Sequence, residues 1–274
     1  MQIISTVAEL RAHLHGKEGV AFVPTMGNLH EGHIDLVRLA REQGKCTVVS
    51  IFVNPLQFGA HEDLAEYPRT LQADCEKLKG LADVVFTPGT SELYAQPQQV
   101  MVEPPLEHDL CGASRPGHFR GVATVVLKLF NIVQPQVAVF GKKDYQQLHV
   151  VRQMVAQLNL PITLIGGDTV RAPDGLALSS RNQYLSAAER AAAPFLQQTL
   201  AQLAQRVQAG ERDYAALERG GVEALTARGW RVDYVAWRAQ DGLMQPQPGE
   251  RDLVLLAAAH LGRTRLIDNL EVCI

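Results

Sequence analysis

Short apolar runs that alternate with helical periodicity limit the fold of this chain more than any other feature. Strand-like runs occupy residues 20–24, 47–53, 83–86, 136–140 and 162–165. Between them, apolar residues recur at helical spacing over 32–43, 69–79, 122–133 and 145–158. Parallel strands need a crossover connection, which is usually a helix. We therefore expect an α/β fold, a Rossmann-like, doubly wound parallel sheet with helices on both faces.

The pattern changes near residue 170. Pro173-Asp174-Gly175 is a strong turn, and Ser186 with Glu189 forms a capping box for a helix that runs to residue 208. A second helix is expected over 214–227, followed by strands over 230–238, 253–260 and 264–268. Because helices are followed by a run of strands, this part predicts a smaller α+β domain. The expected domains are 1–169 and 170–274.

The charge balance excludes some partners. The chain has 26 basic and 29 acidic residues, which gives a net charge of −3 and no footprint for nucleic-acid or membrane binding. The four cysteines form no CxxC pair, so we expect free thiols in a reducing compartment. The first ten residues lack a secretory signal pattern, and the apolar stretches are too short to cross a bilayer. A cytoplasmic protein is expected.

Ligands of open parallel sheets bind at the carboxyl ends of the strands. The sequence has no P-loop and no G-x-G-x-x-G loop, so a nucleotide would be held differently. The first expected strand runs into Pro-Thr-Met-Gly-Asn-Leu-His-Glu-Gly-His at 24–33. His30 and His33 share a face at a helix start, where backbone N–H groups and imidazoles can donate to phosphate oxygens. Two solvated histidines or two metal ligands are the alternative interpretations.

Two further strand ends carry polar side chains. The second expected strand is followed by Asn54 and Gln57, whose amides can orient a hydroxyl or a carboxylate, or can simply form a polar turn. A later strand runs into Gly-Lys-Lys-Asp-Tyr-Gln-Gln at 141–147. A lysine at this bend can pair with phosphate, and Asp144 can hold a ribose hydroxyl or Mg²⁺. Helix capping and surface charge are the alternative explanation for this segment.

Two basic loops complete the candidate set. Leu178-Ser179-Ser180-Arg181-Asn182 stands at the expected domain junction, where two hydroxyls and a guanidinium suit a polyphosphate or, alternatively, cap a helix. The second loop, Arg115-Pro116-Gly117-His118-Phe119-Arg120, is expected to contact an anion or a partner subunit. Three strand ends and the junction loop thus place phosphate-binding groups on one edge of one sheet.

These segments together resemble a known family. The HxGH pattern after the first strand resembles the HIGH-type nucleotidyltransferase superfamily, which includes class I aminoacyl-tRNA synthetases. Within it, the set PTMGNLHEGH, FVNPLQF, YPRT, RPGHFRGV, GKKDYQQ and LSSRNQYLS closely resembles the pantothenate synthetase family. The blocks run in order from about residue 20 to 190, and the last third adds little.

The resemblance implies an ATP-dependent ligase of pantothenate biosynthesis, in the coenzyme A pathway. The carboxylate of (R)-pantoate would attack the α-phosphate of ATP and release pyrophosphate, and β-alanine would then attack the pantoyl adenylate and release AMP. Mg²⁺ would arrive with ATP, without protein metal ligands or an organic prosthetic group. The resemblance also implies a homodimer, an ATP- and pantoate-binding domain over 1–169 and a small lid domain over 170–274. Lid closure would exclude water from the adenylate.

The resemblance assigns roles by motif. His33 matches the proton donor and would act with His30 on the developing pentacovalent phosphate, and Lys143 and Arg181 would complete the catalytic set. The residues implied to bind ATP are Met26, Gly27, Asn28, Leu29, His30, Glu31, Gly32, His33, Gly141, Lys142, Lys143, Asp144, Val170, Leu178, Ser179, Ser180 and Arg181. The residues implied to bind the other substrates are Gln57, Gln147, Asn54, Met26, Val125, Val126 and Phe140.

Other functions remain open at this point. A nucleotidylyltransferase that acts on a phosphorylated acceptor would use the same fold, although apolar pocket positions such as Val125 and Val126 argue against such an acceptor. A truncated aminoacyl-tRNA synthetase fits less well, since the chain lacks an anticodon-binding region and a basic bias. An inactive nucleotide sensor would retain the fold without turnover.

Overall fold

The computed structural model describes residues 1–59 and 62–274 and separates into two compact units. One unit comprises Met1–Lys142 and Val150–Asp168, and the other comprises Lys143–His149 and Thr169–Ile274. The helix Tyr145–Gln157 is thus divided: its first turn belongs to the second unit and its remainder to the first unit. In the described ranges, no helix has the length and apolar character needed to cross a membrane.

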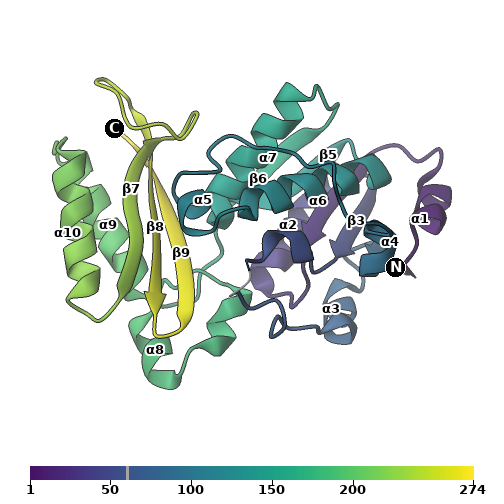
Figure 1. The fold of residues 1–274 in the computed structure, drawn as a ribbon, viewed down its shortest axis with the longest axis horizontal. Coiled ribbons are helices and arrows are strands. Elements are labelled where there is room, and N and C mark those ends of the chain that lie inside the picture. Colours follow the sequence, from purple (N-terminus) through teal and green to yellow (C-terminus); the bar gives the residue numbers. More distant parts are fainter. Residues whose placement is uncertain (60–61) are drawn as a thin grey trace. The chain divides into compact units, whose positions relative to one another are not determined.

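The first unit is built on a six-stranded parallel sheet in the order β1-β4-β3-β2-β5-β6. Figure 1 labels β3, β5 and β6 of this sheet. Its strands are β1 Gln2–Ile4, β2 Val20–Thr25, β3 Cys46–Ile51, β4 Val84–Phe86, β5 Val137–Gly141 and β6 Thr163–Gly167. Its helices are α1 Val7–Leu14, α2 Glu31–Gln43, α3 Leu71–Leu78, α4 Thr90–Leu93, α5 Cys111–Ser114, α6 His118–Val133 and most of α7 Tyr145–Gln157. The predicted parallel α/β sheet is confirmed.

Helices cover both faces of this sheet, because successive strand residues point to opposite sides. Val23 and Val49 face one side and pack in a buried cluster with Val37 of α2 and Leu78 of α3. On the other side, Phe22 of β2 and Phe140 of β5 each meet Phe130 of α6 edge-on, with ring centroids 6.3 Å apart. The predicted covering of both faces is therefore confirmed.

The order of the strands fixes where a ligand can enter. From β2 the chain builds outward through β3 and β4 on one side, and β5 and β6 pair on the other side. The strand order therefore reverses between β2 and β5, and the crevice at such a switch point lies beyond the carboxyl ends of these strands. Residues 26–33 follow β2, and the short 3₁₀ turn Lys142–Asp144 follows β5.

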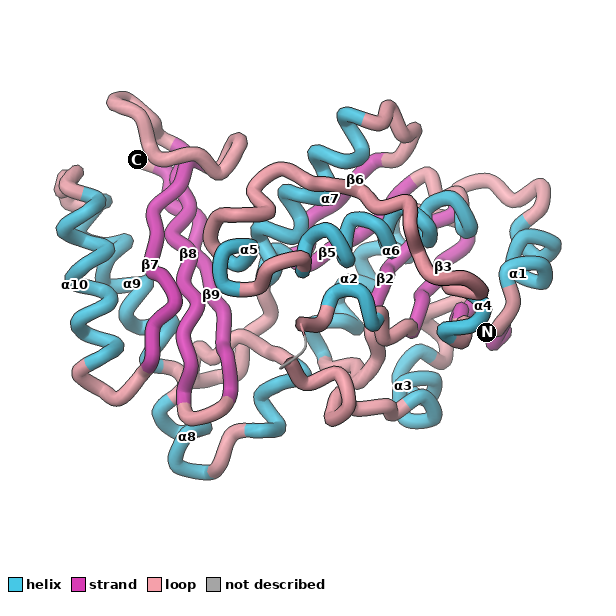
Figure 2. Tube along the Cα trace, viewed as in Figure 1, coloured by secondary structure: helices cyan, strands magenta, loops and turns pink. Residues whose placement is uncertain are grey.

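The second unit holds an antiparallel sheet in the order β7-β8-β9, formed by Arg231–Ala239, Asp252–Leu261 and Thr264–Cys273. Its helices are α8 Ala187–Ala192, α9 Phe195–Gln208 and α10 Tyr214–Thr226, preceded by the 3₁₀ helix Ser180–Tyr184. Figure 2 shows α9 and α10 beside each other on one face of the strands. Their apolar residues pack on that face around Trp237, which is fully buried. The predicted α+β domain is confirmed as a fold.

Two sequence-based expectations about helices need correction. The single helix predicted from Ser186 to 208 is two helices, because Pro194 lacks an N–H and its ring clashes with the preceding turn. The capping box at Ser186 and Glu189 is confirmed. The expected loop at 115–120 is partly helical, since α6 begins at His118, four residues before the predicted start. The short elements β1, α1, α4 and α5 were not predicted.

Candidate active site

The loop after β2 has a backbone that only certain residues can adopt. Gly27 lies at φ +84°, and a Cβ atom there would come within 3.0 Å of Ile51 and 3.1 Å of the Asp74 carboxylate. Asn28 is also left-handed, at φ 50°. Asparagine is among the few residues with a side chain that tolerate this region. The glycine is therefore needed for conformation and for space, and the loop closes tightly onto α3.

Two side chains of α3 hold this loop. Asp74 is fully buried, and its carboxylate accepts the backbone N–H groups of Asn28 at 2.9 Å and Leu29 at 2.8 Å. The hydroxyl of Thr70 donates to the same carboxylate at 3.0 Å. Lys77, one turn further along α3, donates to the carbonyl of Leu29 at 2.6 Å. We call Asp74 and Lys77 the α3 clamp. No motif of the sequence marks this clamp; the only local signal is an acid four residues before the buried Leu78, on the inner face of the helix.

The two histidines stand together at the start of α2. His30 is the N-cap, and its backbone N–H donates to Nδ1 of His33 at 3.3 Å. The two rings lie 4.0 Å apart between centroids. Because a backbone N–H only donates, Nδ1 of His33 carries the lone pair, and the proton of the neutral ring lies on Nε2. Glu31, in contrast, is exposed and paired with Arg38 on the outer side of α2.

The turn after β3 is held by the backbone of α6. Asn54 is buried and caps the 3₁₀ helix Pro55–Gln57 by accepting the N–H of Leu56 at 3.3 Å. Its amide donates to the carbonyl of Gly121 at 3.1 Å. A Cβ atom at Gly121 would lie 2.3 Å from the carbonyl oxygen of Leu56. A glycine is therefore required where α6 packs directly against this turn.

The basic segment 115–120 supports the same turn. Nδ1 of His118 lies 2.9 Å from the backbone carbonyl oxygen of Gln57. Nε2 of the same His118 ring lies 2.9 Å from Nη1 of Arg115. The carbonyl only accepts and the guanidinium only donates, so the ring donates through Nδ1 and accepts through Nε2. Arg115 also forms a bidentate pair with Glu62, at 2.6 and 2.7 Å. Arg115 and His118 therefore support this turn from within the fold, and the expected contact of the segment with an anion or a subunit stays a prediction.

The two turns meet through Met26 and Gln57. Nε2 of Gln57 lies 3.1 Å from the sulfur of Met26, so residues predicted from two different strand ends are brought together. The predicted apolar positions Val125, Val126 and Phe140 are buried in α6 and β5. In the same unit, Gly141 ends β5, and Lys142 pairs with Asp168 at 3.0 Å.

The second unit organises its own candidate residues around β9. The carbonyl of Lys143 accepts the side-chain amide of Asn269 at 2.9 Å, and the Lys143 ammonium lies 3.9 Å from Asp144. Tyr145, at the start of α7, donates to Glu271 at 2.8 Å. These contacts tie the segment after β5 to β9. Gln147 lies within the same first turns of α7 and is partly buried.

The junction loop is tied to the same strand. The N–H of Leu178 donates to the carbonyl of Val170 at 2.9 Å, which brings these two predicted residues together. Arg171 forms a bidentate pair with the buried Asp268 of β9, at 2.7 and 2.8 Å. Ser179 caps the next 3₁₀ helix by accepting the N–H of Arg181 at 3.2 Å. Ser180 and Arg181 begin that helix. Asp268 and Asn269 are thus supporting residues that the sequence analysis missed.

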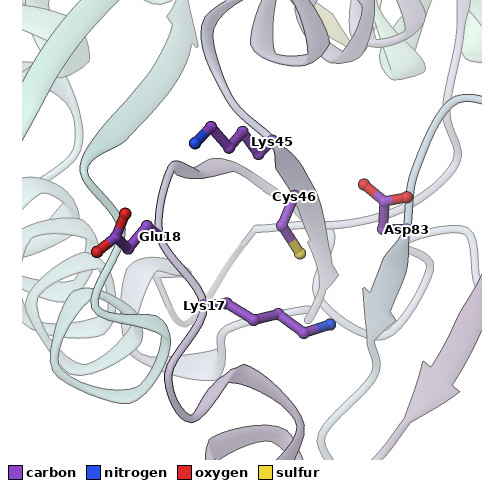
Figure 3. Close-up of a pocket in the computed structure, with 5 residues that line it drawn as sticks. All are labelled: Lys17, Glu18, Lys45, Cys46 and Asp83. Atoms are coloured by element: carbon purple, nitrogen blue, oxygen red, sulfur yellow. The ribbon is translucent and has the colours of Figure 1, made fainter.

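A pocket at the other edge of the large sheet is lined by Lys17, Glu18, Lys45, Cys46 and Asp83 (Figure 3). It lies where β2, β3 and β4 begin, and ligands of such sheets bind where the strands end. Its groups also serve the fold: the Asp83 carboxylate accepts the N–H of Thr47 at 2.7 Å. Over residues 1–59 and 62–274, no cluster of three metal-ligating side chains occurs.

Comparison with known proteins shows which family this chain resembles along its whole length. The family model for pantoate-beta-alanine ligase matches residues 2–271. A pantothenate synthetase from Thiobacillus denitrificans is 60% identical over 99% of this chain and 97% of its own length. One from Chromobacterium violaceum is 59% identical over 99% of both chains.

Solved structures show the same likeness across the whole chain. The pantothenate synthetase of Thermus thermophilus has a TM-score of 0.95 and 48% identity, with 100% of both chains covered. The pantoate-beta-alanine ligase of Francisella tularensis, complexed with beta-gamma ATP and beta-alanine, has a TM-score of 0.77 and 32% identity over 98% of this chain and 97% of that one. The fold, the strand-end residues and these matches lead to one conclusion: the chain belongs to the pantoate–β-alanine ligase family.

Proposed function

We propose that this ATP-dependent ligase condenses (R)-pantoate with β-alanine by means of the residues at the ends of β2, β3 and β5 and in the junction loop. A pantoate carboxylate oxygen attacks the α-phosphorus of ATP, and the bond to pyrophosphate breaks. The β-alanine nitrogen then attacks the acyl carbon, loses a proton and displaces AMP. The contact between Met26 and Gln57 carries the proposal, because it joins the loop that would hold ATP to the turn that would hold the acid.

Residues of the β2 loop would act on the phosphates. With its proton on Nε2, His33 can donate to a phosphate oxygen as negative charge develops there. His30 packs against this ring and would share that role. The remaining backbone of 26–33 would line the nucleotide site, in a conformation that the α3 clamp maintains.

Other residues would complete the two binding sites. Gln57, with support from Asn54, and Gln147 would bind the hydroxyls or the carboxylate of pantoate, and Val125, Val126 and Phe140 would face its methyl groups. In the nucleotide site, Lys143 and Arg181 would neutralise phosphate charge and Asp144 would bind the ribose. The remaining residues proposed to bind ATP are Gly141, Lys142, Val170, Leu178, Ser179 and Ser180. Family membership supports these assignments, since every position lies within residues 2–271, which the family model matches.

Three further properties belong to the same proposal. Mg²⁺ enters as Mg·ATP, because three phosphates bind it without a protein cage. Residues 1–169 bind ATP and pantoate, and 170–274 act as a lid that excludes water from the adenylate. The protein works in the cytoplasm as a homodimer. Sedimentation of the purified chain tests the homodimer: a single species of about 30 kDa would contradict it.

The experiment that tests the reaction follows pyrophosphate and AMP from Mg·ATP. We expect pantoate alone to release pyrophosphate, and sustained AMP formation only after β-alanine is added. A reaction that ignores pantoate but incorporates the nucleotide into a phosphorylated acceptor would instead identify a nucleotidylyltransferase.

A further inference from the structure

Hydrogen bonds to the backbone fix which way the Asn54 amide points. Its Nδ2 faces the carbonyl of Gly121 at 3.1 Å, and its Oδ1 faces the N–H of Leu56 at 3.3 Å. A carbonyl can only accept and a backbone N–H can only donate. Turning the amide over would therefore lose both hydrogen bonds. It would place the side-chain oxygen against the carbonyl of Gly121 and the side-chain N–H₂ group against the N–H of Leu56. Since Asn54 is 1% exposed, water cannot compensate for that loss.

The fixed amide of Asn54 in turn fixes the amide of Gln57. Nδ2 of Asn54 also donates to Oε1 of Gln57 at 3.0 Å. The carbonyl oxygen of the Gln57 side chain is therefore held against Asn54, and Nε2 projects toward the sulfur of Met26. The backbone of Gln57 is held as well, by His118 at 2.9 Å. Gln57 is thus held at both ends, and its amide has a single polarity.

Tyr94, which lies outside the sequence motifs quoted above, adds the last hydrogen bond to this network. It is the residue after α4, and its hydroxyl donates to Oδ1 of Asn54 at 2.8 Å. Its ring packs against Phe52 and lies 5.0 Å below the ammonium of Lys128. Burial raises the pKa of the Tyr94 phenol, so the hydroxyl keeps its proton, and its role as donor, throughout the neutral range.

We propose that Tyr94 and Asn54 are positioning residues that hold Gln57 with its N–H₂ group, and not its carbonyl, toward the acid substrate. This inference rests on the proposed role of Gln57 in binding pantoate. An amide with this polarity recognises an acceptor, such as a carboxylate or hydroxyl oxygen. It disfavours a donor, such as a protonated amine, at the same position. The device would thus help the site to select its acid substrate over its amine substrate.

Tyr94→Phe removes the phenol hydroxyl and leaves the ring packing. Loss of one neutral hydrogen bond that positions Gln57 should raise the KM for pantoate about three- to tenfold, while the KM for ATP stays unchanged. Tyr214→Phe, at a partly buried residue packed against the core of the second unit, is the matched control and should change neither constant. Thermal melting of both variants separates positioning from a general loss of stability, which would affect both substrates.

A double-mutant cycle with Gln57→Ala decides whether Tyr94 acts through Gln57. If it does, Tyr94→Phe raises the KM for pantoate in the normal chain but not in the Gln57→Ala background. Equal effects in both backgrounds would overturn the inference, as would a Tyr94→Phe chain with an unchanged KM for pantoate. A Gln57→Ala chain with an unchanged KM for pantoate would instead overturn the proposed role of Gln57.

Gln57→Glu tests the polarity itself. One carboxylate oxygen can still accept from Asn54, so the other occupies the place of Nε2 and presents negative charge to the acid. We expect this variant to bind pantoate at least about tenfold more weakly than Gln57→Ala does, because like charges then meet at close range. Equal or tighter binding of pantoate by Gln57→Glu would show that a donor is not needed there.

Discussion

The turns after β2 and β3 both carry candidate substrate-binding groups, but they are held in different ways. The β2 loop is fixed by charged side chains, since Asp74 accepts two of its N–H groups and Lys77 donates to its carbonyl. The β3 turn is fixed by neutral amides and by direct packing on α6 at Gly121. The first loop must keep a left-handed backbone, whereas the second must keep one amide in one orientation. The support differs because the feature to be preserved differs.

The largest effect is expected from Asp74→Ala, which removes the main part of the α3 clamp. The N–H groups of Asn28, which is partly buried, and of Leu29, which is buried, would lose their acceptor together with the hydroxyl of Thr70. Leaving a buried donor without its partner costs about 1–3 kcal/mol, so the loss of three such bonds should lower the free energy of unfolding by several kcal/mol. Urea denaturation measures it.

Asp74→Asn is the control that separates shape from charge. Its side chain has nearly the same volume but one acceptor fewer, so it should lose less stability than Asp74→Ala does. Equal stability of Asp74→Ala and the unchanged chain would show that the β2 loop does not depend on the clamp.

The next effect concerns turnover and not stability. His33→Ala removes the imidazole that we propose donates to the phosphate. We expect kcat to fall at least about 10²-fold, which corresponds to about 2.7 kcal/mol, with a melting temperature close to normal because His33 is only partly buried. Pyrophosphate release under saturating substrates measures kcat. An unchanged rate would remove His33 from the mechanism.

For the β3 turn, the corresponding change is Gly121→Ala. The added methyl group would meet the carbonyl of Leu56 at 2.3 Å, so α6 and the turn must move apart. Overpacking of this kind costs about 1–3 kcal/mol, and the displaced Asn54 should also weaken pantoate binding. Gly220→Ala is a matched control within α10, because its nearest neighbour, Arg206, is 3.9 Å from the added atom. Similar melting temperatures for the two variants would contradict the close packing.

The difference between long and short elements shows how far the sequence predicts this fold. Long elements with a clear period, such as α2 and β3, lie within two residues of their expected bounds. The four-residue helices α4 and α5 are too short to show a period, and both were missed. Strand β9 runs to Cys273 and not to 268. Its last residues pair in register with β8, and that pairing decides their conformation more than their local pattern does.

Candidate site residues were predictable when they stand in the motif itself, and supporting residues were not. Gln57 lies in a strand-end turn within one of the quoted motifs, so the sequence alone names it as a candidate. Asp74 acts on residues 46 positions away, Tyr94 on one 40 positions away and Asp268 on one 97 positions away. Such contacts depend on the packing of distant elements, so no local pattern contains them. The sequence therefore indicates candidate site groups more readily than it indicates what holds them.

The smallest expected effect comes from Lys77→Met, which breaks the other half of the α3 clamp. The variant keeps most of the apolar stem but loses the hydrogen bond to the carbonyl of Leu29. Lys77 is exposed, so water can replace the ammonium, and the free energy of unfolding should fall by only about 0.5–1 kcal/mol. The KM for ATP should rise a few-fold if the carbonyl shifts the β2 loop. Lys79→Met, whose ammonium meets only Glu76 on the surface of α3, should leave the KM for ATP unchanged. Equal KM values for ATP in the two variants would show that Asp74 alone maintains the β2 loop. The loop would then depend on its buried carboxylate acceptor and not on the ammonium of Lys77.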